Sequence, residues 1–257
     1  MGAIPMRFLL ETRLLLGRCL RGTLRNPVWI VLGLFQPVLY LLLFAPLLDN
    51  LKMPGFAHTN SLNVFTPGLL VMMALFSAGF AGFNVCQDLR SGVIERLRVT
   101  PASRVAMLLG MVLRDVIIFI VQCALLVLIA MLMGMTVDPL GMLILFGLMT
   151  VIAVMMASAS YAVGFILKNE GSLAAALNTV TLPLMLLSGV MLPLSLAPQI
   201  LQNIASFTPF SHAVDAARAL VNGHLGDQSI GVAFTIVGVL LLLAVFWATR
   251  VFRKAVA

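Results

Sequence analysis

The sequence predicts an all-α integral membrane protein with six transmembrane helices. Of its 257 residues, 61% are hydrophobic and only 10% are charged, whereas soluble domains carry about 25% charged residues. Six apolar runs are long enough to cross a bilayer core of about 30 Å, which takes about 20 helical residues. The basic residues, which give a net charge of +7, are divided among short segments between these runs. This pattern favours an anionic membrane surface over nucleic acid as their partner.

The first expected element is an amphipathic helix over residues 6–25. At 100° per residue its charged side chains form one narrow stripe, opposite apolar side chains that include Leu15 and Leu16. Such a helix lies in the inner membrane interface, and a solvated basic arm is the alternative. Arg13 departs from the pattern because it projects near the apolar side, where it snorkels or meets a partner. The residues assigned to the charged stripe are Arg7, Glu11, Arg18, Arg21 and Arg25.

The six predicted transmembrane helices belong to one membrane domain, residues 1–257. Pro37, Pro46 and Pro183 fall inside them, where a kink is tolerated if neighbouring helices re-satisfy the freed carbonyls. The predicted helices cover residues 28–48, 64–86, 105–135, 140–167, 172–192 and 230–248.

Small residues at helical spacing predict that the second and the fourth of these helices each make a close helix contact. Ala74, Ala78 and Gly82 recur every fourth residue in the second helix, and Ser160 and Gly164 do so in the fourth. Small side chains let helix backbones approach each other in a membrane.

The distribution of basic residues predicts the orientation of the chain. Lysine and arginine are retained on the cytoplasmic side of a membrane. With the N-terminus inside, fourteen of the sixteen basic residues lie on that side, and only Lys52 and Arg218 lie on the other. We therefore expect a multi-pass protein of the cell inner membrane with both termini in the cytoplasm.

The longest cytoplasmic loop, residues 87–104, is expected to dock a cytosolic partner. Ser91 or Gly92 opens a short helix and Pro101 ends it, because proline disfavours helical geometry in the residue before it. Apolar side chains then share one face between charged ones and form a compact peg that transmits force to the membrane helices. On composition alone, an ordinary basic loop is the better alternative. The residues assigned to the peg are Arg90, Gly92, Val93, Ile94, Glu95, Arg96, Leu97, Arg98 and Pro101.

The helix after this loop is expected to run from Ser103 to Met135, which makes it longer than the bilayer is thick. It therefore projects into the cytoplasm and places Arg114 and Asp115 near the inner interface, where we expect a structural role. Ionised groups in mid-bilayer, the alternative, would indicate an ion pathway.

The outer segment, residues 192–226, is too long for a simple turn and too apolar for a solvated loop. We expect two short helices that dip into the outer leaflet, the first over residues 198–207. Thr208 caps the second, with Pro209 at its first position, and the Asn-Gly pair at 222–223 ends it.

Polar side chains on the second outer helix fall at i, i+3 and i+6, so they predict a surface ladder of hydrogen bonds and charges. A lid over an exit pathway is one functional alternative. A metal or catalytic site is disfavoured because the chain has only three histidines. The residues assigned to the outer helices are Pro198, Pro209, His212, Asp215 and Arg218.

Polar residues inside the predicted spans are mostly expected to hold the helices together. Asn178, Thr179 and Thr181 lie next to Pro183 in the fifth span, and we assign them to the lining of a transport pathway.

The sequence indicates an external source of energy. A phosphate-binding loop has the form GxxxxGKS/T, and none of Lys52, Lys168 and Lys254 follows a glycine. A proton- or sodium-coupled carrier would bury carboxylates in its spans, and none lies clearly inside the predicted ones. We therefore expect ATP hydrolysis by another polypeptide, and no catalytic residue, metal or cofactor in this chain.

Two stretches resemble the permease subunits of type-2 ABC exporters, most closely the branch of daunorubicin-resistance and nodulation-factor exporters. DLRSGVIERLRVTPASRVAMLLGMVLRD, residues 88–115, matches the family pattern of a glycine, Glu-Arg-Leu and a proline before a long helix. The second stretch is LSGVMLPLSLAPQILQNIASFTPFSHAVDAARAL, residues 187–220. The matching residues are Gly92, Glu95, Arg96, Leu97, Pro101, Arg104 and Gly110 in the first, and Ser188, Gly189, Pro193, Pro198, Pro209, Asp215, Arg218 and Ala219 in the second.

The resemblance implies a six-helix subunit that pairs with a second permease copy or a paralogue and binds two cytosolic ABC ATPase subunits. ATP and Mg²⁺ would bind to the ATPase, residues 87–104 would act as the coupling helix, and the outer helices would shape the exit. The cargo would be a hydrophobic or amphipathic small molecule, such as a drug, an antibiotic or a lipid-like compound. It would leave the cytoplasm or the inner leaflet.

Other functions stay open from the sequence alone. A permease for lipid-linked saccharides is one, although the chain has only two Trp and two Tyr, which are ring-stacking residues of the kind that sugar binding favours. A secondary carrier or small channel without an ATPase is another. A membrane enzyme is disfavoured because no catalytic residues cluster in the sequence.

Overall fold

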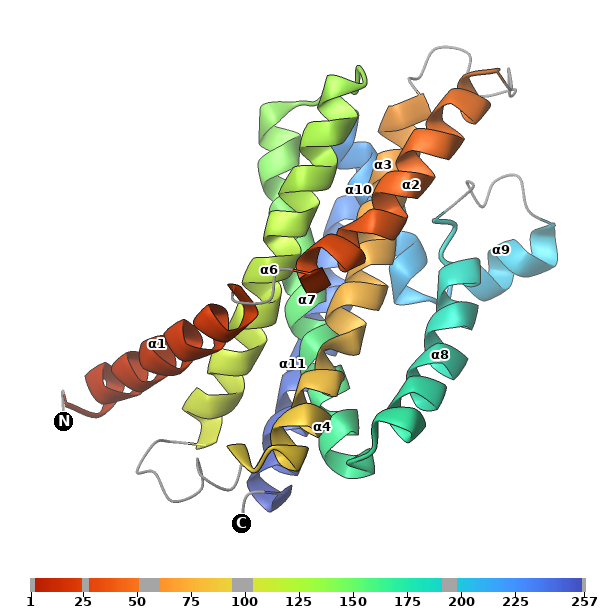
Figure 1. The fold of residues 1–257 in the computed structure, drawn as a ribbon. Coiled ribbons are helices and arrows are strands. Elements are labelled where there is room, and N and C mark those ends of the chain that lie inside the picture. Colours follow the sequence, from red (N-terminus) through yellow and green to blue (C-terminus); the bar gives the residue numbers. More distant parts are fainter. Residues whose placement is uncertain (1–2, 25–27, 51–60, 94–103, 191–197, 256–257) are drawn as a thin grey trace.

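The structure is a computed structural model that describes residues 3–24, 28–50, 61–93, 104–190 and 198–255. Over these ranges the regular elements are all helices and no strand occurs, which confirms the all-α prediction. Both chain termini lie at the same end of the helix bundle (Figure 1). We call this the basal end, and the opposite one the distal end.

Within the described ranges, six long helices follow the order of the six predicted spans. Five are long and apolar enough to cross a membrane, and α2 contains a shorter apolar stretch, Ile30–Phe44. The chain is therefore a multi-pass membrane protein. The six are α2 (Val28–Asn50), a composite of α3 (Ser61–Met73), η1 (Ala74–Ala78), η2 (Gly79–Ala81) and α4 (Gly82–Arg90), then α6 (Arg104–Leu132), α7 (Pro139–Leu167), α8 (Glu170–Leu187) and α11 (Gln228–Ala255).

Two of these helices end before the predicted residue. α6 stops at Leu132 because Gly134 adopts φ +104°, and α8 stops at Leu187, shortly before Gly189 at φ +65°. A left-handed backbone ends a helix, and glycine adopts it without the steric cost that a Cβ brings.

The predicted amphipathic helix is present as α1, which covers Ala3–Leu24. It leans away from the bundle and packs against the basal half of α6 (Figure 1), where a Cβ on Gly110 would lie 3.0 Å from the Leu15 Cβ. Leu10 and Leu14 are 58% and 65% exposed. An isolated helix with exposed leucines at the edge of a bundle suits a membrane interface.

The composite second span contains a π turn, η1, followed by a 3₁₀ turn, η2, and this break faces α7. The amide of Gly82 donates a hydrogen bond of 2.9 Å to the Ser160 hydroxyl, which itself donates to the Gly79 carbonyl. The two backbones are too close here for a larger residue: a Cβ atom added to Gly164 would lie 2.9 Å from the Gly82 carbonyl oxygen. Both spans make a close contact through small residues, as predicted, and the structure shows that they make it with each other.

The two predicted outer helices are α9 (Gln199–Ala205) and α10 (Pro209–Val221). They differ in environment: α10 is packed among α3, α7 and α11, with Ala213, Ala216 and Leu220 fully buried. In α9, Ile200 is 74% exposed. α10 is therefore part of the bundle interior, whereas Ile200 of α9 faces outward.

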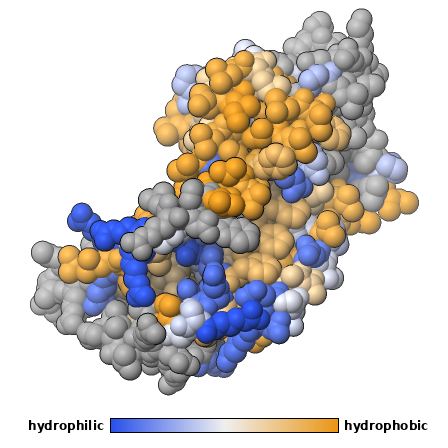
Figure 2. All heavy atoms as spheres, viewed as in Figure 1, coloured by the Kyte–Doolittle hydropathy of each residue, from blue (hydrophilic) through white to orange (hydrophobic). Residues whose placement is uncertain are grey.

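Side chains on the visible face divide by polarity along the bundle. Hydrophobic residues cover its distal and middle parts, and hydrophilic residues gather toward the basal end (Figure 2). Apolar side chains that point away from the bundle include Leu132, Leu186 and Leu242, which are 81%, 75% and 71% exposed. An apolar surface of this kind is stable only against lipid or another protein.

Candidate functional site

A buried polar triad joins α6 to α7 in the basal half of the bundle. The Arg114 guanidinium donates to the Asp115 carboxylate at 2.8 Å and to the Tyr161 phenol oxygen at 3.0 Å. The Tyr161 hydroxyl in turn donates to the other Asp115 oxygen. Tyr161 is fully buried, and the side chains of Arg114 and Asp115 are each 11% exposed. Each charge therefore has a partner inside the bundle.

The triad lies ten residues into α6, about 15 Å from its first residue at 1.5 Å per residue, beside α1. The Arg114 charge acts on Asp88 of α4 and on Cys19 of α1. Burial raises the pKa of the Cys19 thiol, and the Arg114 guanidinium opposes this increase. The structure thus supports the expected structural role for Arg114 and Asp115.

The predicted peg lies mostly outside the residues that the structure describes, which end at Val93 before this segment and begin again at Arg104. Arg90 ends α4 and forms an ion pair of 3.0 Å with Glu170, the first residue of α8. Gly92 has φ +67° and lies in a turn, and Val93 packs against the core. Ile94, Glu95, Arg96, Leu97, Arg98 and Pro101, which carry the rest of the assignment, lie outside the described residues.

The charged stripe assigned to the interfacial helix is partly described. Arg18 and Arg21 are exposed, and Glu11 is half-buried. Thr12 is buried at 8% exposure, so α1 turns that face toward the bundle. The side chain of Arg7 and the whole of Arg25 lie outside what the structure describes.

Arg218 of α10 connects this helix to α3 and to the segment after α8 through hydrogen bonds at the distal end. Its Nε donates to the Val64 carbonyl of α3 at 3.1 Å, and its Nη2 donates to the Gly189 carbonyl after α8 at 2.8 Å. The side chain is only 14% exposed. The prediction of a surface ladder is therefore wrong for Arg218, because the guanidinium is enclosed between backbone carbonyls that are distant in sequence.

The other members of the predicted ladder are only loosely connected. Asp215 lies 3.8 Å from Arg218 and is 57% exposed, and the His212 ring contacts the Ser206 carbonyl at 3.0 Å. Burial raises the pKa of the Asp215 carboxyl, and Arg218 and His212 oppose the increase.

The predicted helix bounds hold for α10. Pro209 starts it and Asn222 ends it, as expected. Thr208 occupies the capping position, but its hydroxyl donates to the Ala205 carbonyl and caps no amide. Pro198 occupies the corresponding position before α9 and is exposed.

A second polar cluster at the distal end was not predicted. The Asn63 amide nitrogen donates to the Thr136 carbonyl at 2.9 Å and to the Asn222 side-chain oxygen at 3.3 Å. The Thr136 amide donates back to Asn63 at 3.3 Å. Three segments that are far apart in sequence meet here, and each residue alone looked like an ordinary helix-end polar residue.

The residues assigned to a pathway lining do not share one environment. Asn178 and Thr179 are exposed, and the Thr179 hydroxyl donates to the Ala175 carbonyl within α8 at 2.8 Å. Thr181 is 3% exposed and faces the bundle. In its most apolar stretch, α8 has only 11% of its residues buried, so this helix offers most of its surface to lipid or to a partner.

Comparisons with known proteins agree with this architecture. Residues 11–222 match the family described as ABC-2 type transporter. The chain is 27% identical to the daunorubicin resistance ABC transporter permease protein of Streptomyces coeruleorubidus over 89% of its own length and 81% of the relative's. It is 29% identical to the ycf38 protein of Pyropia yezoensis, which is named as a transport permease, over 82% and 73% of the two chains.

The family match covers most of the chain, which therefore belongs to the ABC-2 type transporter family. It is a permease subunit, without catalytic activity of its own, in a family whose permeases bind no cofactor and work with an ATPase subunit. In the part of the chain that the structure describes, no group of three His, Cys, Asp or Glu residues is placed to hold a metal ion.

Proposed function

We propose that this permease subunit exports a hydrophobic or amphipathic small molecule, with energy from two copies of a cytosolic ATPase. The permease pairs with a second copy of itself or with a paralogue, and the cargo leaves between the two permeases. The basal end faces the cytoplasm, where residues 87–104 dock on the ATPase.

One observation carries the need for an external ATPase. Among the described residues, Arg114 and Asp115 are deeply buried charged side chains that pair with each other, and Tyr161 is hydrogen-bonded to both. A carrier coupled to protons or sodium needs an ionisable group that can exchange its ion. The triad has no such free group, so the geometry favours energy that arrives mechanically from outside the bundle.

The position of the triad supports the proposal that residues 87–104 dock on the ATPase. α4 leads into residues 94–103 and α6 begins after them, and Arg114 acts on Asp88 of α4. A push on this loop would therefore reach α7 through Tyr161 and α8 through the Arg90–Glu170 pair.

Two facts support the proposed cargo class: the composition of the chain and the name of one relative. The chain has sixteen Met and sixteen Phe but only two Trp and two Tyr, and methionine adapts to apolar molecules of varied shape. The Streptomyces relative is named for daunorubicin resistance. Both facts favour a hydrophobic compound over a lipid-linked saccharide.

Co-purification with the ATPase tests the proposal. The full chain is co-expressed with a Walker-A ATPase encoded beside its gene, and ATP hydrolysis is measured in lipid vesicles. Truncating a central interface residue costs about 2 kcal/mol or more, so Glu95→Ala and Arg96→Ala should each weaken association by at least about tenfold.

Lys52→Ala, on the side predicted to face away from the ATPase, is the matched control and should retain association and hydrolysis. Normal association and hydrolysis in both loop variants would contradict the docking role. Failure of the wild-type pair to associate at all would contradict the permease–ATPase scheme itself.

A further inference from the structure

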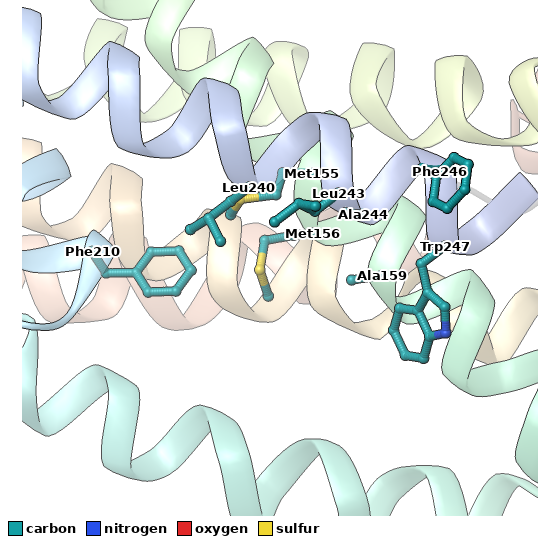
Figure 3. A pocket seen from close by; sticks show the side chains of 9 residues that line it. All are labelled: Met155, Met156, Ala159, Phe210, Leu240, Leu243, Ala244, Phe246 and Trp247. Atoms are coloured by element: carbon teal, nitrogen blue, oxygen red, sulfur yellow. The ribbon is translucent and has the colours of Figure 1, made fainter.

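An open apolar groove runs along the bundle between α7, α10 and α11. It has a volume of about 540 Å³ and is lined by apolar and aromatic side chains (Figure 3). Met155 and Met156 of α7 form its floor, Phe210 of α10 lies at one end and Trp247 of α11 lies at the other. This volume falls in the range of about 300–1,000 Å³ that holds a drug-sized ligand or a comparable piece of hydrocarbon.

The α11 wall of the groove continues beyond Trp247 as a basic stripe. Leu240, Leu243 and Trp247 line the groove, and Arg250 and Lys254 follow at i+3 and i+7 from Trp247, on the same face of the helix. Both are exposed, and no ion pair within the described part of the chain involves either of them. An apolar groove and two exposed positive charges are therefore adjacent along α11.

The length of this arrangement matches one leaflet of a bilayer. Leu240 and Arg250 are ten residues apart, about 15 Å along the helix axis, which is half of a bilayer core of about 30 Å. Trp247 lies one turn before Arg250 and is 42% exposed, as expected for a tryptophan near the headgroup level. A molecule that fits both parts has a long hydrocarbon chain and a negative headgroup.

We propose that this groove binds an anionic phospholipid, with one acyl chain along Met155, Met156 and Leu240 and its headgroup at Arg250 and Lys254. The site lies within one subunit and is independent of the cargo and of the ATPase. Its two methionines provide an adaptable floor that accepts acyl chains of different shape.

Tryptophan quenching by brominated lipids tests the site directly. The chain has two tryptophans, so Trp29→Phe leaves Trp247 as the sole reporter. The full-length variant is reconstituted in phosphatidylcholine vesicles that contain acyl-brominated phosphatidylglycerol, and in vesicles in which phosphatidylcholine carries the bromine. We expect a relative association constant about fivefold or more in favour of phosphatidylglycerol, the preference that one basic residue provides at an anionic surface.

Two further variants separate the headgroup from the groove. Arg250→Gln/Lys254→Gln should bring the preference to about one while both lipids still quench Trp247, because the charge attraction is removed. Ala159→Leu fills the groove and should abolish the preference. Gly147→Leu, on the same helix where an added Cβ meets nothing within 4 Å, should retain it.

Equal quenching by the two lipids in the Trp29→Phe protein would overturn the proposal, and so would a preference that survives either the charge variant or the filling variant. Protection of Trp247 from both lipids would show that a second copy or another protein covers the groove, and would also overturn it.

Discussion

The Arg114 guanidinium on α6 and the Tyr161 phenol on α7 are joined by a hydrogen bond of 3.0 Å inside the helix bundle. The bond links α6, which begins after residues 94–103, to α7. Ser160 of α7 in turn is hydrogen-bonded to Gly82 in the broken second span. The triad of Arg114, Asp115 and Tyr161 is therefore the polar centre of the basal half.

Removal of one charge from the triad should destabilise the protein strongly. Arg114→Met leaves Asp115 buried without its cation, and breaking a buried ion pair in this way costs about 3–5 kcal/mol. The free energy of unfolding, measured by denaturant titration in mixed micelles, should fall by this amount.

The double variant Arg114→Met/Asp115→Leu should recover much of that loss, because apolar residues of similar volume replace buried pairs at little cost. If it also restores ATP hydrolysis by the assembled transporter, the pair is structural. A double variant as unstable as the single one would contradict this account of the triad.

Gly82→Ala should destabilise the contact between the second span and α7. Its Cβ would collide with the Ser160 backbone and side chain, and overpacking of this kind costs about 1–3 kcal/mol. Gly147→Ala, at a position with open space inside α7, should not destabilise the protein, because alanine has the higher helix propensity. Thermal unfolding in detergent compares the two; equal effects would show that Gly82 is not at a tight contact.

The length of the apolar runs was sufficient to locate the long helices. The spacing of small residues indicated close contacts, but it did not show that Gly82 lies against Ser160. Helical spacing was misleading for Arg218, whose spacing from Asp215 indicated a surface pair. Its partners, the carbonyls of Val64 and Gly189, are backbone atoms on other segments. Periodicity shows which residues share a face, but the neighbour of that face depends on how the helices pack.

The same limit explains the unpredicted cluster of Asn63, Thr136 and Asn222. These residues are brought together only when three helix ends meet at the distal end. Residues 94–103 contain the Glu-Arg-Leu sequence and the proline of the family pattern, and they lie outside the described residues, so the coupling assignment still depends on the sequence.

Arg218→Lys should weaken the distal end. Lysine keeps the charge but lacks the planar fork that reaches two carbonyls, and a hydrogen bond to a charged group contributes about 1.5–3 kcal/mol. Proteolysis or hydrogen exchange of α10 should then show increased opening. Protection of α10 equal to that of the wild type would contradict the role given to Arg218.

Asp215→Asn is the control for that variant, and it should have a smaller effect because its contact with Arg218 is 3.8 Å long and exposed.

Burial raises the pKa of the Asp215 carboxyl, so the folded state holds the proton more tightly than the unfolded state. This contribution to stability is present at low pH and is lost as the pH rises through the folded-state pKa. Asp215→Asn should remove that dependence.

The Arg90–Glu170 pair should contribute little to stability, since its side chains are 60% and 40% exposed. Exposed pairs contribute about 0.2–1 kcal/mol. Arg90→Glu and Glu170→Arg should each reduce ATP hydrolysis in the assembled transporter if the pair transmits motion to α8, and the double exchange should restore it. Additive losses in the double variant would mean that the two residues act separately.

The central claim is that residues 87–104 face the cytoplasm and receive the movement of the ATPase. Glu95→Cys, in a chain whose Cys19, Cys86 and Cys123 are replaced by serine or alanine, is treated in intact cells with a membrane-impermeant thiol reagent. Lys52→Cys in the same background is the control expected to react. We predict no labelling of position 95 until the membrane is permeabilised; labelling in intact cells would place the loop outside and contradict the mechanism.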